Sequence, residues 1–287
     1  MIKLFFVFAF ISATLSNVND KPAYILYDSE GIQTSYTAML DTLKNADIIL
    51  IGEFHDNPIS HWMEYEITKD LFYYKKFNMV LGAEMFEADN QEGLDKYLKG
   101  EIDDKKLAEE VRLWPNFKTD YKPLLDFAKK MGLKFIATNI PRTYANMVFK
   151  GGFEALDELN KKEKAWIAPL PILYEPNLKC YQKMLSMNNH AMTANENLPK
   201  AQAIKDATMA YFILENWQEG KTFIHYNGAY HSDGREGIYW YLKMKNKNLK
   251  IVTISTVTQQ DINKLEDENR YLADFIICVP ETMTRTY

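Results

Sequence analysis

The chain contains 287 residues, of which 47% are hydrophobic and 14% aromatic, and its formal net charge is −5. This length and apolar content are sufficient for one α/β domain that carries an insertion. Positive and negative side chains are interspersed and form no basic stripe, so the composition argues against nucleic acid as a partner. The two cysteines, Cys180 and Cys278, lack the spacing of a thiolate metal site, and we expect both to be free thiols.

Residues 1–16 have the pattern of a signal peptide. Lys3 precedes a short apolar stretch at residues 4–11, and small residues for cleavage follow at Ser12, Ala13 and Ser16. The alternative is a short core strand or helix. The signal-peptide interpretation predicts secretion across the inner membrane, to the periplasm or the outer-membrane periphery, and a single α/β domain over residues 17–287. Because this region has no cysteine, we expect no lipid attachment there.

Apolar runs alternate with helical patterns along the rest of the chain. Strands alternating with helices predict an α/β fold with a mostly parallel central sheet flanked by helices. After an extended piece at 24–28, the predicted strands are residues 48–51, 79–85, 134–138, 222–226, 251–257 and 275–279. The predicted helices are residues 35–44, 59–74, 90–110, 122–132, 200–217 and 237–243.

Residues 151–198 contain no apolar run typical of a buried strand, and we call this segment the insertion. It is Pro-rich at 170–176, and a helical pattern follows at 177–187. We interpret it as a helical lid over the carboxyl ends of the strands, whose exposed Met and Tyr side chains can hold a flat ligand or a second subunit. The alternative is an ordinary helical subdomain that packs its own core.

Polar side chains collect where the predicted strands end. Ligands of open α/β sheets lie outside the carboxyl ends of the strands, so these residues are site candidates. Two His with Glu form a metal-ligand set, and a Glu–His pair is also suited to acid–base catalysis. Arg142 can bind a carboxylate or simply form a salt bridge. The candidates are Glu53 and His55, Glu84, Asn139 and Arg142, His231, and the pair His61 and Glu64 on one helix face.

The segment Gly52-Glu53-Phe54-His55-Asp56-Asn57-Pro58 with His61 resembles the opening motif of the ChaN-like haem-binding lipoproteins, in the superfamily of the Tiki proteases and erythromycin esterases. The resemblance implies an α/β core with a helical cap and a role in haem or iron acquisition at the cell envelope. The chain departs from the family in lacking the lipobox Cys and in having Ala229-Tyr230 before His231. Further matches are residues 82–86, 139–142, 201–202, 206–210 and 227–231.

The resemblance also implies haem bound through a tyrosine, in a pocket that a second subunit completes. The expected partners are therefore haem, a second copy of the chain, and outer-membrane haem or iron uptake machinery. The insertion offers Tyr174 and Tyr181, and we favour Tyr181 because it shares a predicted helix with Met184 and Leu185. His190 is a candidate for a propionate hydrogen bond, and Asn139, Arg142, His61 and Glu64 complete the cofactor-binding candidates.

Three functions stay open from the sequence. The first is a haem-binding envelope protein that is not an enzyme. The second is a hydrolase in which Glu53, His55, Glu84 and His231 bind a divalent metal or activate water. The third is an envelope binding module that makes no use of its strand-end acids.

Overall fold

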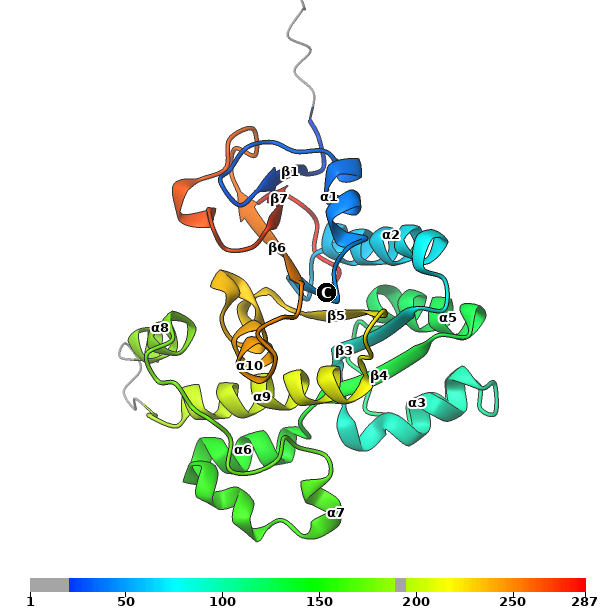
Figure 1. The fold of residues 1–287 in the computed structure, drawn as a ribbon, viewed down its shortest axis with the longest axis vertical. Coiled ribbons are helices and arrows are strands. Elements are labelled where there is room, and N and C mark those ends of the chain that lie inside the picture. Colours follow the sequence, from blue (N-terminus) through cyan, green and yellow to red (C-terminus); the bar gives the residue numbers. More distant parts are fainter. Residues whose placement is uncertain (1–20, 189–194) are drawn as a thin grey trace, which may run out of the picture.

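The computed structural model of the chain describes residues 21–188 and 195–287. The predicted signal peptide and His190 lie outside the described residues. The fold is a single seven-stranded sheet in the order β1-β7-β6-β2-β5-β3-β4, with helices on both faces (Figure 1). The strands are β1 (Ile25–Asp28), β2 (Ile48–Glu53), β3 (Met79–Glu87), β4 (Lys134–Asn139), β5 (Thr222–Gly228), β6 (Ile251–Gln259) and β7 (Phe275–Pro280).

The sheet is mostly parallel, as the sequence predicts. Only β1 pairs antiparallel, with β7 at one edge, and the other neighbouring strands run in the same direction. Every residue of β2 and β5 is buried. Such strands are apolar on both faces because helices cover both sides of the sheet.

Alternation along β2 divides the core into two layers. Ile49 and Ile51 belong to the larger core, whose helical residues come mainly from α1, α2, α3 and α5. Ile48 and Leu50 face the opposite way, into a core shared with α9 and α10. These helices are α1 (Tyr36–Leu43), α2 (Pro58–Lys75), α3 (Gln91–Leu98), α5 (Lys122–Met131), α9 (Leu198–Asn216) and α10 (Ile238–Lys245).

Local signals fix several helix ends. Asn57 caps α2 by accepting hydrogen bonds from the backbone N–H groups of Ile59 and Ser60, and Pro58 occupies the first turn. The prediction of one helix over residues 90–110 is wrong. The segment divides into α3 and α4 (Asp104–Glu110), because Gly100 has φ +76° and Asp103 caps a new helix.

The insertion is helical but made of short pieces. Following α6 (Arg142–Gly151), it comprises η3 (Phe153–Glu158), α7 (Lys161–Lys164) and α8 (Lys179–Asn188). Leu156 and Ile167 pack with residues of α6 and α9, so this part forms a small core of its own, and α6 and α7 lie along one side of α9 (Figure 1). The α8 helix lies beside the end of β5, where the Tyr230 hydroxyl donates to the backbone carbonyl of Cys180.

Both cysteines are buried free thiols, as expected. Within residues 21–188 and 195–287, none of the helices combines the length and apolar character needed to cross a bilayer.

Candidate functional site

The carboxyl ends of β2, β5 and β3 bring the strand-end residues together. β5 lies between the other two strands, and Glu53 at the end of β2 is in register with Gly228 at the end of β5. The backbone N–H of Gly228 donates to Glu84 Oε2 at 2.8 Å. A Cβ atom on Gly228 would lie 3.0 Å from His55 Nε2 and 3.5 Å from Glu84 Oε2, so both side chains converge over this glycine.

The segment η4 (Ala229–His231) follows Gly228 directly and places His231 against Glu84. Its position depends on a close backbone approach, since a Cβ atom on Gly52 would lie 2.9 Å from Ala229 Cα. The structure therefore gathers Glu53, His55, Glu84 and His231 at one end of the sheet, as the sequence analysis expected of them.

A cleft of about 930 Å³ opens at this end of the sheet. Among the residues that the structure describes, none from the insertion lines it. Its far wall comes instead from residues 112–115 and from the start of α6. Arg142 is exposed and lines the cleft with no acidic partner among the described residues, while Asn139 donates to the backbone carbonyl of Glu84. The polar residues that line the cleft are His55, Glu84, Glu87, Asp89, Arg112, Asn139, Arg142, Thr143, Asn146, Lys205 and His231.

His55 and Glu53 form the first acid–histidine pair. His55 Nδ1 lies 2.6 Å from Glu53 Oε1, and the His55 side chain is 34% exposed while the Glu53 side chain is fully buried. Burial by itself would raise the pKa of Glu53, but the hydrogen bond from His55 and the charges of His61 and His55 outweigh burial and lower the pKa to about 2. Burial would lower the pKa of His55, yet Glu53 and Glu84 raise it. The pair therefore places a buried carboxylate behind the partly exposed imidazole of His55.

His231 lies between two buried carboxylates. Its Nε2 is 3.1 Å from Glu84 Oε1, and its Nδ1 contacts Asp206 Oδ1. Burial would lower the pKa of His231, but the charges of Glu84 and Asp206 outweigh it and raise the pKa to about 10. Because both ring nitrogens face carboxylates, both hold a proton and the ring is an imidazolium. The geometry at the cleft favours acid–base chemistry over metal binding.

Asp206 and Gln202 are site residues that the sequence analysis quoted in a motif but did not assign to the site. Both lie on α9, and Gln202 Nε2 is 3.0 Å from His231 Nδ1. The signal that could have identified them was their spacing of four residues, which places both on one helix face toward the sheet end. Tyr121 was also missed, and its hydroxyl donates to Glu53 Oε1 at 2.8 Å.

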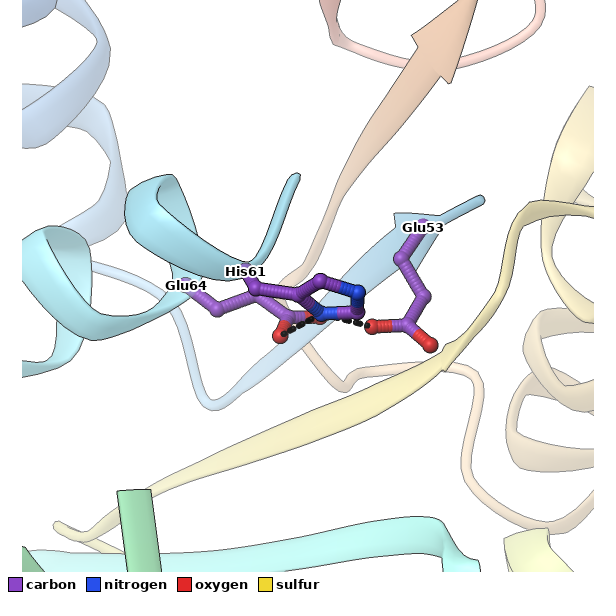
Figure 2. A group of neighbouring side chains, drawn as sticks. All are labelled: Glu53, His61 and Glu64. Carbon is purple, nitrogen blue, oxygen red and sulfur yellow. Dashed lines mark ion pairs between the residues drawn. The ribbon is translucent and has the colours of Figure 1, made fainter. Parts of the chain in front are cut away.

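His61 and Glu64 lie behind Glu53, in the interior rather than in the cleft (Figure 2). They share one face of α2, as the spacing predicts. His61 Nδ1 is 3.0 Å from Glu53 Oε2 and 3.6 Å from Glu64 Oε2. Three ionisable residues thus form a buried group that is distinct from the cleft.

A family model described as haem-binding uptake, Tiki superfamily, ChaN, matches residues 39–242. The chain belongs to this ChaN family. A structure titled as cofacial haem binding to ChaN of Campylobacter jejuni covers 88% of this chain and 96% of its own, with a TM-score of 0.67 and 18% identity. A Bacillus cereus protein covers 85% of this chain and 90% of its own, with a TM-score of 0.51 and 13% identity.

A plant protein is also similar to this chain. RETICULATA-RELATED 5, a chloroplast protein of Arabidopsis thaliana, is 25% identical over an alignment of 193 residues that covers 63% of this chain and 26% of that protein. The chain therefore spans about a quarter of the length of this relative.

In this ChaN-family protein the two tyrosines of the insertion differ sharply. Tyr181 is 0% exposed, and its hydroxyl donates to Asp206 Oδ2 at 2.8 Å. The expectation that Tyr181 is exposed on the insertion is wrong, because this hydrogen bond and the core around Ala203 draw it inward. Tyr174 is half-buried, with ring centroids 5.4 Å from Phe153 and 5.7 Å from Tyr181.

The raised pKa of His231 predicts a specific loss of stability with rising pH. An unfolded histidine has a pKa of about 6.5, whereas His231 in the folded chain has a pKa of about 10. Between these values the folded chain holds a proton that the unfolded chain releases. The contribution of His231 to the free energy of unfolding is complete below about pH 6.5 and is lost as the pH rises through about 10.

Urea denaturation of the wild type and of His231→Gln at several pH values checks this. We expect the difference in their free energies of unfolding to shrink as the pH rises, by on the order of 1 kcal/mol per pH unit. A difference that is constant from pH 6 to pH 10 contradicts the prediction.

Proposed function

We propose that this protein binds haem for uptake, and that haem is its principal ligand. The observation that carries the proposal is the family match over residues 39–242, which covers most of the sheet and both flanking helical layers. The Campylobacter jejuni ChaN fold supports it, since that structure covers 88% of this chain.

We propose Tyr174 as the axial ligand of the haem iron. A phenolate suits ferric haem, and tyrosine is among the known axial ligands. Tyr174 is partly exposed and packs beside Phe153, and it has no hydrogen bond from its hydroxyl to any described residue. Tyr181 is less suited, because its hydroxyl is buried against Asp206 and burial raises its pKa strongly.

We propose a homodimer as the haem-loaded form. A porphyrin held at a partly exposed tyrosine leaves its other face in water, and a second copy of the chain would cover it. Leu173 beside Tyr174 is 55% exposed, which adds apolar surface for such a contact. Arg142 and Asn139 are proposed for carboxylate groups of a ligand that reaches the cleft.

Haemin titration of Tyr174→Phe and Tyr181→Phe tests the ligand assignment. The wild type is expected to show a saturable ferric tyrosinate spectrum. Tyr174→Phe should lose that spectrum and weaken binding by at least about tenfold, or ~1.4 kcal/mol. Tyr181→Phe is the matched control and should keep both. Sedimentation with haemin reports the dimer, and loss of the spectrum in Tyr181→Phe alone would overturn the assignment.

A second function, hydrolysis, is favoured by the arrangement at the cleft. Glu53 holds His55 through Nδ1, and His55 Nε2 lies toward Glu84 over Gly228. In this proposal Glu84 accepts a proton from water, the resulting hydroxide attacks the carbonyl carbon, and protonated His55 donates its proton to the leaving group. His231, held as a cation, stabilises the negative charge that forms on the carbonyl oxygen.

Hydrolysis of a panel of esters and peptides tests the second function. Glu84→Gln and His55→Gln are each expected to lower kcat by about 10²–10⁴-fold, the usual contribution of a positioned acid or base. Glu87→Gln is the control, because Glu87 also lines the cleft but pairs with Arg112. Failure of the wild type to turn over any substrate removes this function and leaves haem binding untouched.

We propose that the chain works in the cell envelope, as the signal-peptide pattern of residues 1–16 predicts, and that it hands haem to or from outer-membrane uptake machinery. Expression of the full chain followed by periplasmic extraction and N-terminal sequencing checks the first part. We expect a soluble periplasmic product cleaved near Ser16. A cytoplasmic product that retains Met1 would contradict it.

A further inference from the structure

Behind the cleft, three ionisable side chains meet in the interior with their ligand atoms all within 4.8 Å of one another. Glu53 comes from the end of β2, and His61 and Glu64 come from adjacent positions on one face of α2 (Figure 2). His61 is 6% exposed, Glu53 is 1% exposed and Glu64 is 0% exposed. Neither the haem proposal nor the hydrolase proposal uses His61 or Glu64.

Four polar atoms of this cluster are buried without a hydrogen bond. They are Glu53 Oε2, His61 Nδ1 and both carboxylate oxygens of Glu64. A buried polar atom without a partner costs roughly 1–3 kcal/mol, and a charged one costs more. His61 Nδ1 lies 3.0 Å from Glu53 Oε2, yet the two atoms lack the directions of a hydrogen bond.

Glu53 Oε1 and His61 Nε2 have partners outside the cluster. Glu53 Oε2 and His61 Nδ1 are therefore left facing the centre of the cluster. His61 Nε2 lies 3.2 Å from the backbone carbonyl oxygen of His55 and 3.4 Å from Asp120 Oδ2, so Nε2 faces acceptors and Nδ1 is left to face Glu53 and Glu64. Without an ion these two carboxylates raise the pKa of His61 to about 11, and an ion bound here would displace the proton from Nδ1. Metal-binding histidines donate their second ring N–H to a carbonyl or carboxylate in this manner.

Glu53 is arranged in the same way. Its Oε1 accepts from the Tyr121 hydroxyl at 2.8 Å and from His55 Nδ1 at 2.6 Å, so only Oε2 is left over. Glu64 offers both of its oxygens. Once the Nδ1 proton of His61 is displaced, two carboxylates and one imidazole present oxygen and nitrogen donors to one point.

We propose that Glu53, His61 and Glu64 bind a divalent first-row transition-metal ion. Such ions bind carboxylate oxygen and imidazole nitrogen at about 2.0–2.2 Å, which puts neighbouring ligand atoms about 3.0–3.6 Å apart. The separations of 3.0 Å and 3.6 Å from His61 Nδ1 match that spacing. Two carboxylates balance the charge of the ion, and the mixed donors suit Mn²⁺, Fe²⁺ or Zn²⁺ better than Ca²⁺.

The ion would lie behind the cleft, not in it. His55 separates the two regions, since its Nδ1 bonds to Glu53 while its ring also lines the cleft. An ion bound to Glu53 Oε2 would fix the carboxylate that orients His55. The alternative explanation for this cluster is that Glu64 carries a proton, which would also relieve the repulsion between the Glu53 and Glu64 carboxylates.

The first measurement uses the full haem-free chain after treatment with a chelator. Titration with MnCl₂, ZnCl₂ and CaCl₂ by calorimetry, with metal content by mass spectrometry, should give one transition-metal ion per chain and weaker binding of Ca²⁺. The melting temperature should rise with added Mn²⁺ or Zn²⁺. A wild type that binds none of these ions overturns the proposal, and because no haem is present the haem proposal is unaffected.

Variants then locate the ion. Glu64→Gln keeps the shape of a protonated Glu but cannot supply an anionic ligand, and we expect affinity to fall by at least about a hundredfold. Tyr121→Phe removes a partner of Glu53 and should weaken binding about tenfold. Glu66→Gln, on the exposed side of the same helix and paired with Lys69, is the control and should bind as the wild type does.

Two results would overturn the assignment. Glu64→Gln that binds metal with wild-type affinity would show that Glu64 holds only a proton. Binding that is abolished by Glu84→Gln but kept in Glu64→Gln would move the ion to the cleft.

Discussion

The close approach of β2, β5 and β3 at Gly228 is the constraint on which the site depends. β5 brings no side chain to this point, so His55 and Glu84 can meet above the backbone of Gly228. The backbone N–H of the same residue holds Glu84 in place. Any larger residue at position 228 would occupy the space in which His55, after β2, and Glu84, on β3, approach each other.

Burial of charge then sets the properties of the site. Each cleft histidine has a carboxylate behind it, Glu53 for His55 and Asp206 for His231. Burial opposes every one of these charges, so the ions persist only because they are paired. The consequence is a cleft with a fixed array of protonated rings and carboxylates, which suits proton transfer and the binding of anionic groups.

The two other proposed ligand sites lie outside the cleft. The insertion carries Tyr174 at a partly exposed position, linked to the cleft through the contacts of Tyr181, Asp206 and His231. The α2 helix carries His61 and Glu64 behind Glu53. One end of the sheet thus carries a cleft, a partly exposed tyrosine and a buried group of ligand atoms, and Glu53 belongs both to the pair with His55 and to the buried group.

The sequence alone determined the fold class and the positions of the strand-end residues. Apolar runs of the length of a buried strand and the alternation with helices are local properties, so the parallel sheet was predictable. The break in the helix predicted over residues 90–110 was harder to predict. Gly100 ends the first helix and Asp103 caps the second only when the chain changes direction between them.

Tertiary structure alone determined which of these side chains contact one another and which are buried. The sequence pattern predicts that Glu53 and Glu84 lie near the ends of their strands, but only the strand order β2-β5-β3 places Gly228 between them. The burial of Tyr181 follows from Asp206, which lies 25 residues away. The separation of His61 and Glu64 from the cleft follows from the packing of α2 against the sheet. Long-range pairing and burial depend on contacts between distant segments, and a linear pattern does not contain them.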